Sequence, residues 1–237
     1  GEFDYTEEQR NLITTKMKDY FNENNHNEKQ VKNDIIKELV CELVYTTCGI
    51  KPNDDKAFAL REKIYNGTSD FFLWHTWFND VFNRPNSCNG GFDIVIGNPP
   101  YIDSETMTNN GLEWERKLLQ KTFANLAGNW DIYMAFFELG LSLGSILSFI
   151  TPDKWLSKGF GLKFRENQLR RRLSLITKAG SKVFESATVD AIITLFKRNS
   201  NELKAYEFTT SDTISFRSAK NVNNIDKPYL IDFMFSE

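Results

Sequence analysis

The chain has 237 residues, of which 41% are hydrophobic, and it contains 20 Phe and 5 Trp. This length and composition suit one large packed domain or two small ones and exclude an intrinsically disordered chain. The 29 basic and 32 acidic residues give a net charge of −3, which excludes a uniformly basic nucleic-acid-binding protein. Any contact with phosphates therefore requires basic residues gathered on one face, or a DNA-gripping part outside this chain.

Cysteine, histidine and hydropathy patterns narrow the class further. Cys41, Cys48 and Cys88 lack metal-site spacing and leave one cysteine unpaired, which is typical of the reducing cytoplasm. No signal peptide and no apolar run of transmembrane length occurs, so we expect a cytoplasmic protein without membrane contact. We expect no metal, because His26 and His75 are the only histidines and lie far apart, in a polar turn and between two tryptophans.

The first part of the chain is predicted to be entirely helical. Apolar residues recur at helical spacing over residues 6–22 and about 29–48, and the second helix is expected to stop at Gly49. A third helix over 53–65 is expected to end at Asn66-Gly67. This opening segment has no catalytic constellation, so we interpret it as a packed insertion or arm.

The most informative stretch starts with a short apolar strand. Phe92 and residues 94–96 lie between Gly90-Gly91 and Gly97, a pattern typical of a buried strand. The chain continues as Asn98-Pro99-Pro100-Tyr101. Because open α/β sheets bind ligands outside the carboxyl ends of their strands, Asn98 occupies an expected ligand position. The two prolines fix their own φ angles and hold the residues before them extended, so this loop is predicted to be stiff.

The groups on this loop suit a planar base that carries an exocyclic amino group. The Asn98 side-chain oxygen and the Pro99 carbonyl can each accept one N–H of the amine, and Tyr101 offers a stacking face. Two acceptors held out of the ring plane favour a pyramidal nitrogen, whose lone pair is then available for attack. No general base is needed, because the cationic product amine is acidic enough to lose its proton afterwards. The alternative is a proline-rich turn that closes a core strand.

Strand and helix patterns alternate from residue 92 to residue 196. Helices are predicted over 113–123, 129–143 and about 161–172, and strands over 145–150 and 189–196. This alternation predicts a mostly parallel α/β sheet. Thr151-Pro152-Asp153 follows the strand at 145–150, again at a C-terminal edge. After residue 200, short β-like runs are predicted over 205–209, 214–216 and 229–235.

Asn98-Pro99-Pro100-Tyr101 resembles the NPPY motif of S-adenosylmethionine-dependent amino methyltransferases. The longer string 72–102, with Trp74-His75, Val81-Phe82 and Gly90-Gly91-Phe92-Asp93, is similar to adenine-specific DNA methyltransferases of type IIG and related restriction–modification systems. Further along, Asp131-Ile132-Tyr133 with Phe137-Glu138 resembles the helix after the NPPY strand, and Phe149-Ile150-Thr151-Pro152 resembles the next strand and loop.

This resemblance implies transfer of a methyl group from S-adenosylmethionine to the amino group of a flipped adenine in double-stranded DNA. It implies catalytic roles for Asn98, Pro99, Pro100 and Tyr101. Val183-Phe184 resembles the segment whose aromatic residue stacks on the flipped base, so Phe184 is expected to bind substrate; the alternative is an ordinary core Phe. Extrusion of a base costs a few kcal/mol, and stacking is worth about 1–3 kcal/mol per base, so two rings can offset most of that cost.

The resemblance covers about residues 71–198 and lacks a cofactor-binding half. The family holds S-adenosylmethionine with a glycine-rich loop after its first strand and an acidic residue after its second, and neither occurs upstream of Asn98. We therefore expect an α/β fold, a partial Rossmann-like methyltransferase sheet preceded by a helical segment. A chain that opens at Gly1 without Met is expected to be a fragment of a larger enzyme.

The expected division of the chain has three parts. Residues 1–70 form the helical insertion or arm, 71–200 the catalytic half, and 201–237 the start of a target-recognition region. The expected partners are double-stranded DNA and the remainder of the parent polypeptide, including its cofactor-binding half. The isolated chain is expected to be inactive, or very nearly so.

Other functions remain open from the sequence. NPPY-type loops also serve enzymes that methylate a protein glutamine amide or a guanine amino group in RNA, although residues 74–82 and the extension past 200 favour the DNA enzymes. A nucleic-acid-binding or interaction module that keeps the fold without the chemistry is the second alternative. A basic run either meets phosphates or forms a solvated helix face, and it consists of Lys158, Lys163, Arg165, Arg170, Arg171, Arg172 and Lys178.

Overall fold

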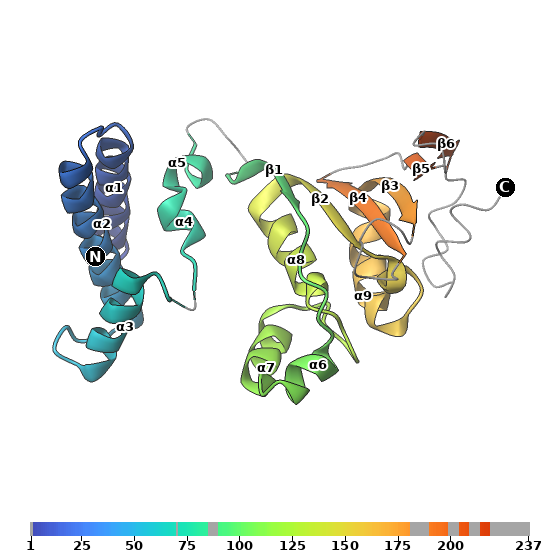
Figure 1. The fold of residues 1–237 in the computed structure, drawn as a ribbon, viewed down its shortest axis with the longest axis horizontal. Helices are drawn as coiled ribbons and strands as arrows, with labels where there is room; N and C mark the ends of the chain where they lie inside the picture. Colours follow the sequence, from blue (N-terminus) through green and yellow to red (C-terminus); the bar gives the residue numbers. More distant parts are fainter. Residues whose placement is uncertain are drawn as a thin grey trace. The chain divides into compact units, whose positions relative to one another are not determined.

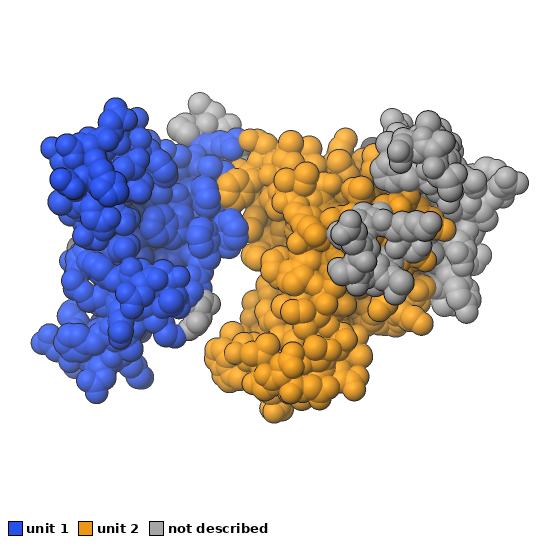
Figure 2. All heavy atoms as spheres, in the orientation of Figure 1, with its two compact units in different colours: residues 1–90 blue, residues 91–237 orange. Residues whose placement is uncertain are grey.

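The structure is a computed structural model that describes residues 2–69, 71–84, 90–180, 190–198, 204–208 and 214–218. Two units are distinguished, residues 1–90 and residues 91–237 (Figure 2). The expected three-part division into 1–70, 71–200 and 201–237 stays a prediction, because these units do not by themselves assign roles to segments.

The first unit is a set of helices (Figure 1): α1 (Glu2–Phe21), α2 (His26–Cys48), α3 (Asp55–Asn66), α4 (Trp74–Trp77) and α5 (Asn79–Phe82). The three long helices confirm the helices that the sequence predicts. Asn25 caps α2 by accepting hydrogen bonds from two backbone N–H groups, and Gly49 ends it at φ 63°. α1 and α2 pack through a small apolar core that includes Ile13, Ile36 and Val40.

The second unit contains the strands and the remaining helices (Figure 1). Its strands are β1 (Phe92–Gly97), β2 (Gly144–Pro152), β3 (Leu173–Gly180), β4 (Ala191–Lys197), β5 (Lys204–Phe208) and β6 (Ile214–Ser218). Between β1 and β2 lie α6 (Ser104–Asn109), α7 (Glu113–Thr122) and α8 (Tyr133–Leu143). Two single 3₁₀ turns, Asp153–Leu156 and Gly159–Gly161, follow β2. They lead into α9 (Leu162–Phe164), a π-helical turn (Arg165–Leu169) and α10 (Arg170–Arg172).

The described strands form one sheet in the order β1-β2-β4-β3-β5-β6. The pairs β1–β2 and β3–β5 are parallel, whereas β2–β4, β3–β4 and β5–β6 are antiparallel. The prediction of a mostly parallel sheet is therefore wrong: the sheet is mixed. A parallel connection needs a crossover of a dozen or more residues, and the segment 181–190 between β3 and β4 is shorter than that. The α/β class and the helical segment ahead of the sheet are confirmed.

An aromatic cluster forms the core of this unit. Phe137 of α8 lies 5.4 Å from Trp155, 5.0 Å from Phe164 and 5.5 Å from Phe196, measured between ring centroids, and none of these side chains is exposed to solvent. α8 approaches the sheet closely at Gly140, where an added Cβ would lie 2.6 Å from a methyl carbon of Leu147 in β2. The cluster thereby holds α8 against one face of β1 and β2.

Two predicted helices are shorter than expected. The helix predicted over 129–143 begins at Tyr133, because residues 130–132 pair with residues 102–104 instead. The helix predicted over 161–172 is broken into short pieces around Arg165. The buried guanidinium of Arg165 donates to the carbonyl oxygens of Trp155 at 2.6 Å and Lys158 at 2.9 Å, which ties this segment to the turn before it.

Candidate active site

The loop after β1 lies at the carboxyl end of a parallel strand pair. The register of β1 and β2 places Gly97 opposite Phe149. The residue after Gly97 is Asn98, and the residue after Phe149 is Ile150. Asn98 and Ile150 are therefore neighbours at the same end of the two strands, and Thr151 follows Ile150 in β2. Carboxyl ends of adjacent parallel strands are where open α/β sheets bind ligands. The structure thus places Asn98 beside the carboxyl-terminal part of β2. Thr151 and Pro152, which the sequence analysis places after the strand, still belong to β2 and pair with β4.

The hydroxyl of Tyr101 connects the loop after β1 with β2. It donates a hydrogen bond to Asn98 Oδ1 at 2.8 Å and lies 3.3 Å from the carbonyl oxygen of Ile150. A phenol has one proton, so the shorter contact marks Asn98 as the main acceptor. The amide oxygen of Asn98 keeps a second lone pair for another donor. Tyr101 therefore fixes the direction in which Asn98 presents its oxygen.

The four loop residues differ in exposure in a way that suits presentation of one polar group. Asn98 and Pro100 are exposed, Pro99 is buried and Tyr101 is half-buried. An Asn98 side chain turned into the protein interior would rule out a role in binding, and the structure places it in contact with solvent. The Tyr101 ring packs edge-to-face on Tyr133 of α8, with centroids 6.2 Å apart and planes at 88°. The loop is thus anchored at Pro99 and Tyr101 and open at Asn98.

The residues that follow the loop are held in place by pairing between residues 102–104 and 130–132. Ser104 N donates to Trp130 O at 2.8 Å and Ile132 N donates to Ile102 O at 2.9 Å, on either side of an antiparallel bridge between Asp103 and Asp131. Asp103 also caps α6, because its Oδ1 accepts from the backbone N–H groups of Glu105 and Thr106. The segment after Tyr101 is consequently held at both ends.

Ionisable groups around the loop have displaced pKa values. Burial raises the pKa of Asp131 to about 6, and the neighbouring Asp103 carboxylate adds to the rise. Burial also raises the pKa of Tyr101, as does the negative charge of Asp131. The pKa of the fully buried Tyr133 is raised by burial and then by Asp131, Asp153 and Tyr101. Tyr101 consequently remains a protonated hydrogen-bond donor at neutral pH.

Three buried polar atoms behind the loop have no hydrogen-bond partner among the described residues: Trp130 Nε1, Asp131 Oδ1 and Tyr133 Oη. Buried polar groups in folded proteins are nearly always paired with protein or ordered water, so unpaired ones require an explanation. All three belong to the short stretch that leads into α8. Tyr133 packs on Tyr101, so one of these unpaired groups belongs to a residue that borders the Asn98 loop.

Several other predicted features fall outside this site. Phe184 belongs to residues 181–189, which lie outside the described residues, so its distance from Tyr101 stays untested. Among the basic residues, Arg165 is buried and donates to backbone carbonyls, so its assignment to phosphates or to a solvated face is wrong. Lys158, Lys163 and Arg171 are exposed. Either interpretation of those three residues remains.

Sequence reasoning missed the supporting residues of this site. It treats Tyr101 as a stacking face alone, whereas the hydroxyl links Asn98 to Ile150, which lies 49 residues further along the chain from Tyr101. Only the hydrogen bond to Asn98, three residues away in a stiff loop, could have been found from spacing. Asp103 ahead of a helix start carries a recognisable capping signal, which also went unused. Within the described ranges, no three His, Cys, Asp or Glu side chains gather in a way that could hold a metal ion.

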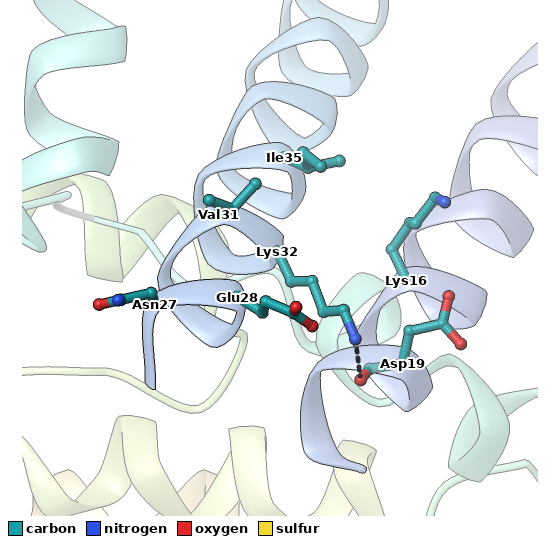
Figure 3. A pocket seen from close by; sticks show the side chains of 7 residues that line it. All are labelled: Lys16, Asp19, Asn27, Glu28, Val31, Lys32 and Ile35. Atoms are coloured by element: carbon teal, nitrogen blue, oxygen red, sulfur yellow. Dashed lines mark hydrogen bonds between the residues drawn. The ribbon is translucent and has the colours of Figure 1, made fainter. Parts of the chain in front are cut away.

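A hollow lies in the helical unit, between α1 and α2 (Figure 3). It has a volume of about 410 Å³. Val31 and Ile35 on α2 form its apolar side, and Lys16 and Asp19 come from α1 (Figure 3). Lys32 bridges the helices by donating to the carbonyl oxygen of Asp19 at 3.3 Å. This hollow brings together no groups with catalytic chemistry. Each helix of the described part of the chain is too short or too polar to cross a membrane.

The chain is similar in sequence to methyltransferases of restriction-modification systems. The sequence model of a family described as Eco57I restriction-modification methylase matches residues 4–184. The type II restriction enzyme and methyltransferase RM.Eco57I of Escherichia coli is 26% identical over 136 residues, which cover 54% of this chain and 14% of that protein. The type II methyltransferase M.PaeR7I of Pseudomonas aeruginosa is 36% identical over 75 residues, covering 30% of this chain and 12% of the relative.

A third relative, the type II methyltransferase M.TthHB8I of Thermus thermophilus, is 26% identical over 145 residues, which cover 59% of this chain and 31% of the relative. The chain therefore spans less than a third of the length of each of these proteins. Among solved structures, the type IIL restriction-modification enzyme MmeI in complex with DNA aligns with 58% of this chain and 19% of its own, at 20% identity and a TM-score of 0.42. The type IIG restriction endonuclease BpuSI aligns with 56% of this chain and 20% of its own, at 17% identity and a TM-score of 0.40.

Proposed function

The chain belongs to the Eco57I restriction-modification methylase family, and on that premise we propose that it is the catalytic half of an adenine-specific DNA methyltransferase. The complete enzyme transfers a methyl group from S-adenosylmethionine to the exocyclic amino group of an adenine in double-stranded DNA, within a restriction–modification system of the cytoplasm. The observation that carries this proposal is the loop Asn98-Pro99-Pro100-Tyr101 at the carboxyl end of β1, with an exposed Asn98 whose oxygen is fixed by Tyr101.

The contribution of this chain is to bind and orient the amine. Asn98 Oδ1 accepts one N–H of the adenine amino group with the lone pair that Tyr101 leaves unused, and the Pro99 carbonyl accepts the other. An amine held by two acceptors outside the ring plane has its lone pair localised on nitrogen and is a better nucleophile. Pre-positioned acceptors of this kind lower a barrier without reorganisation during the reaction. The cationic product amine then loses its proton to water.

The extruded adenine is held by aromatic rings on its two faces. Extruding a base from the duplex costs a few kcal/mol, and each stacked ring contributes about 1–3 kcal/mol. Tyr101 provides one ring, and its half-buried position against Tyr133 keeps it in a single orientation. Phe184 provides the second ring. In this proposal the two rings sandwich the base, and its amino group meets Asn98.

S-adenosylmethionine supplies the electrophilic methyl group, and we propose that the main loop that binds it lies outside this chain. β1 is the first strand among the described residues, so no strand, glycine-rich turn and helix precede Asn98 in that part of the chain. We assign the loop to a cofactor-binding half in the remainder of a parent polypeptide, because the chain spans less than a third of the length of each relative described above.

One face and one edge of β1 are uncovered, which supports this assignment. Val95 packs toward the core, whereas Ile94 and Ile96 on the opposite face of the strand are 61% and 80% exposed. β1 also lies at an edge of the described sheet. Strands of parallel sheets are normally covered on both faces, and an apolar edge strand is a template for further pairing. We assign the cofactor-binding half to this uncovered side of β1.

Radiolabelled methyl transfer tests the proposal. The parent polypeptide is expected to methylate the amino group of adenine in duplex DNA, and the isolated 237-residue chain is expected to transfer no measurable label. Label transferred by the isolated chain would refute the missing cofactor half. A parent polypeptide that labels a protein glutamine or a guanine in RNA, and leaves DNA unlabelled, would refute the substrate assignment.

A further inference from the structure

A polar pocket lies next to the candidate active site, on the side of α6 and α7. It has a volume of about 320 Å³ and opens to solvent. α6 contributes Ser104, Glu105, Thr108 and Asn109 to its lining, α7 contributes Arg116, and the loop before Trp130 contributes Asn129. Almost every lining side chain carries a hydrogen-bonding group. The pocket is therefore suited to a polar or charged ligand and not to an apolar one.

Arg116 is the group that gives this pocket its charge preference. Its Nε is buried and donates to no acceptor among the described residues. A buried donor without a partner is costly, and more so when it belongs to a charged group. The planar guanidinium presents donors in a fork that matches the oxygens of a phosphate. An anionic oxygen ligand would satisfy this donor.

Asn129 adds a second donor to the pocket. Ser104 Oγ lies 2.7 Å from Asn129 Oδ1, so the amide oxygen is occupied and the amide NH₂ group is left to donate. Thr108 donates its hydroxyl proton to Ser104 O at 3.0 Å. Glu105 is exposed and carries the one carboxylate in the lining. A singly charged phosphate diester suits one arginine and an exposed carboxylate better than a doubly charged monoester does.

The pocket is rigidly connected to the Asn98 loop. Ser104 follows Tyr101 by three residues, which places their Cα atoms within about 11 Å of each other. The intervening residues are held by the hydrogen bonds from Ser104 N to Trp130 O and from Ile132 N to Ile102 O. Neighbouring phosphates of a DNA strand lie within this range of an extruded nucleotide. A base at Asn98 thus brings its own backbone near the pocket.

We propose that this pocket binds a backbone phosphate diester of the DNA strand that carries the flipped adenine, with Arg116 as the cation that contacts it. This inference rests on the proposed function, because it requires DNA as the substrate. It gives a chain with net charge −3 a specific phosphate contact close to the chemistry. The contact positions the strand and reads no base, as phosphate contacts generally do.

The test compares Arg116→Gln with Lys117→Gln in the full-length enzyme. Lys117 is the matched control, because it is the next residue on α7, its side chain is 68% exposed and it pairs with Glu113. The dissociation constant for duplex DNA is measured over a range of salt concentrations, on duplexes with and without the recognition site. Urea unfolding midpoints of both variants verify that the fold is kept.

Loss of one phosphate contact lowers the slope of log affinity against log salt by about 0.9, which weakens binding about eightfold at 0.1 M salt. Arg116→Gln is expected to show this change on the duplex with the recognition site, where an adenine is extruded, and not on the duplex without it. Lys117→Gln is expected to match the wild type on both. An unchanged slope in an Arg116→Gln enzyme would overturn the phosphate assignment and leave the methyltransferase proposal standing. A loss that is equal on the two duplexes would overturn the placement of this contact beside the flipped adenine. A wild-type enzyme without affinity for DNA would overturn both proposals.

Discussion

Replacing Tyr101 by Phe isolates the role of one hydroxyl group. The ring and its edge-to-face contact with Tyr133 are retained. The change removes the hydroxyl that donates to Asn98 at 2.8 Å and lies 3.3 Å from the carbonyl oxygen of Ile150. Because Asn98 is exposed, water replaces the lost donor, and the net free energy at stake is that of one ordinary hydrogen bond, about 1 kcal/mol. The amide of Asn98 then samples other orientations. A loss of about 1 kcal/mol in transition-state stabilisation lowers the rate about fivefold.

Single-turnover methyl transfer by the full-length enzyme separates this effect from binding. Tyr101→Phe is expected to lower the rate constant about fivefold with little change in DNA affinity, because the stacking ring remains. Tyr101→Ala removes the ring as well and is expected to weaken binding of the extruded base by a further 1–3 kcal/mol, roughly the value of one stacked base. A Tyr101→Phe enzyme as fast as the wild type would refute the idea that this hydroxyl positions Asn98. Equal loss of DNA affinity in the two variants would refute the stacking role.

Three further predictions concern stability and the edge of the sheet. The pKa of Asp131 is about 6 in the folded chain, whereas that of an exposed Asp is about 3.9. Between these two pH values the folded state binds more protons than the unfolded state. The free energy of unfolding therefore falls as the pH rises from 4 to 6. Asp131→Asn is therefore expected to raise the free energy of unfolding by about 1–2 kcal/mol at pH 7.5, allowing for solvent screening, and to change it little at pH 4. Urea titrations at the two pH values measure this difference. A loss of stability at pH 7.5 would contradict the prediction. Arg165→Gln removes two charge-assisted hydrogen bonds from a buried side chain and is expected to lower the free energy of unfolding by about 3 kcal/mol. Arg171→Gln, at an exposed position, is expected to change it by less than about 0.5 kcal/mol. Equal effects of the two substitutions in urea titrations would show that Arg165 is not structural. Ile96→Lys, at a side chain that is 80% exposed, is expected to leave the unfolding of the isolated chain unchanged and to lower methyl transfer by the parent polypeptide at least tenfold; full activity would contradict the docking of the cofactor half on β1.

Local signals were sufficient for the helical unit. Gly49 and Gly67 end α2 and α3 with positive φ, and an Asn and an Asp cap their starts. Each of these features depends on a few neighbouring residues, so the sequence pattern contains them. The strand at 92–97 was predictable for the same reason, because glycines bracket a short apolar run. The loop after it follows directly from two prolines.

Non-local features could not be read in this way. The alternating pattern of strands and helices wrongly predicts a parallel β4. β4 is antiparallel to both β2 and β3, because the connection from β3 is too short for a crossover. The start of α8 at Tyr133 depends on pairing between residues 102–104 and 130–132, which local periodicity does not reveal. Arg165 reads as one member of a basic run, yet its partners are the carbonyls of Trp155 and Lys158 in a turn that precedes it. The Tyr101 contact with Ile150 spans 49 residues of sequence.

The most direct test of the account is the effect of Asn98→Ala on methyl transfer by the full-length enzyme. Mass spectrometry of duplex DNA after incubation with S-adenosylmethionine measures methylated adenine and distinguishes it from other products. The account predicts at least a hundredfold loss of turnover, because the amine loses one of its two acceptors, together with unchanged DNA affinity and an unchanged unfolding midpoint. A variant that methylates adenine at the wild-type rate would contradict it.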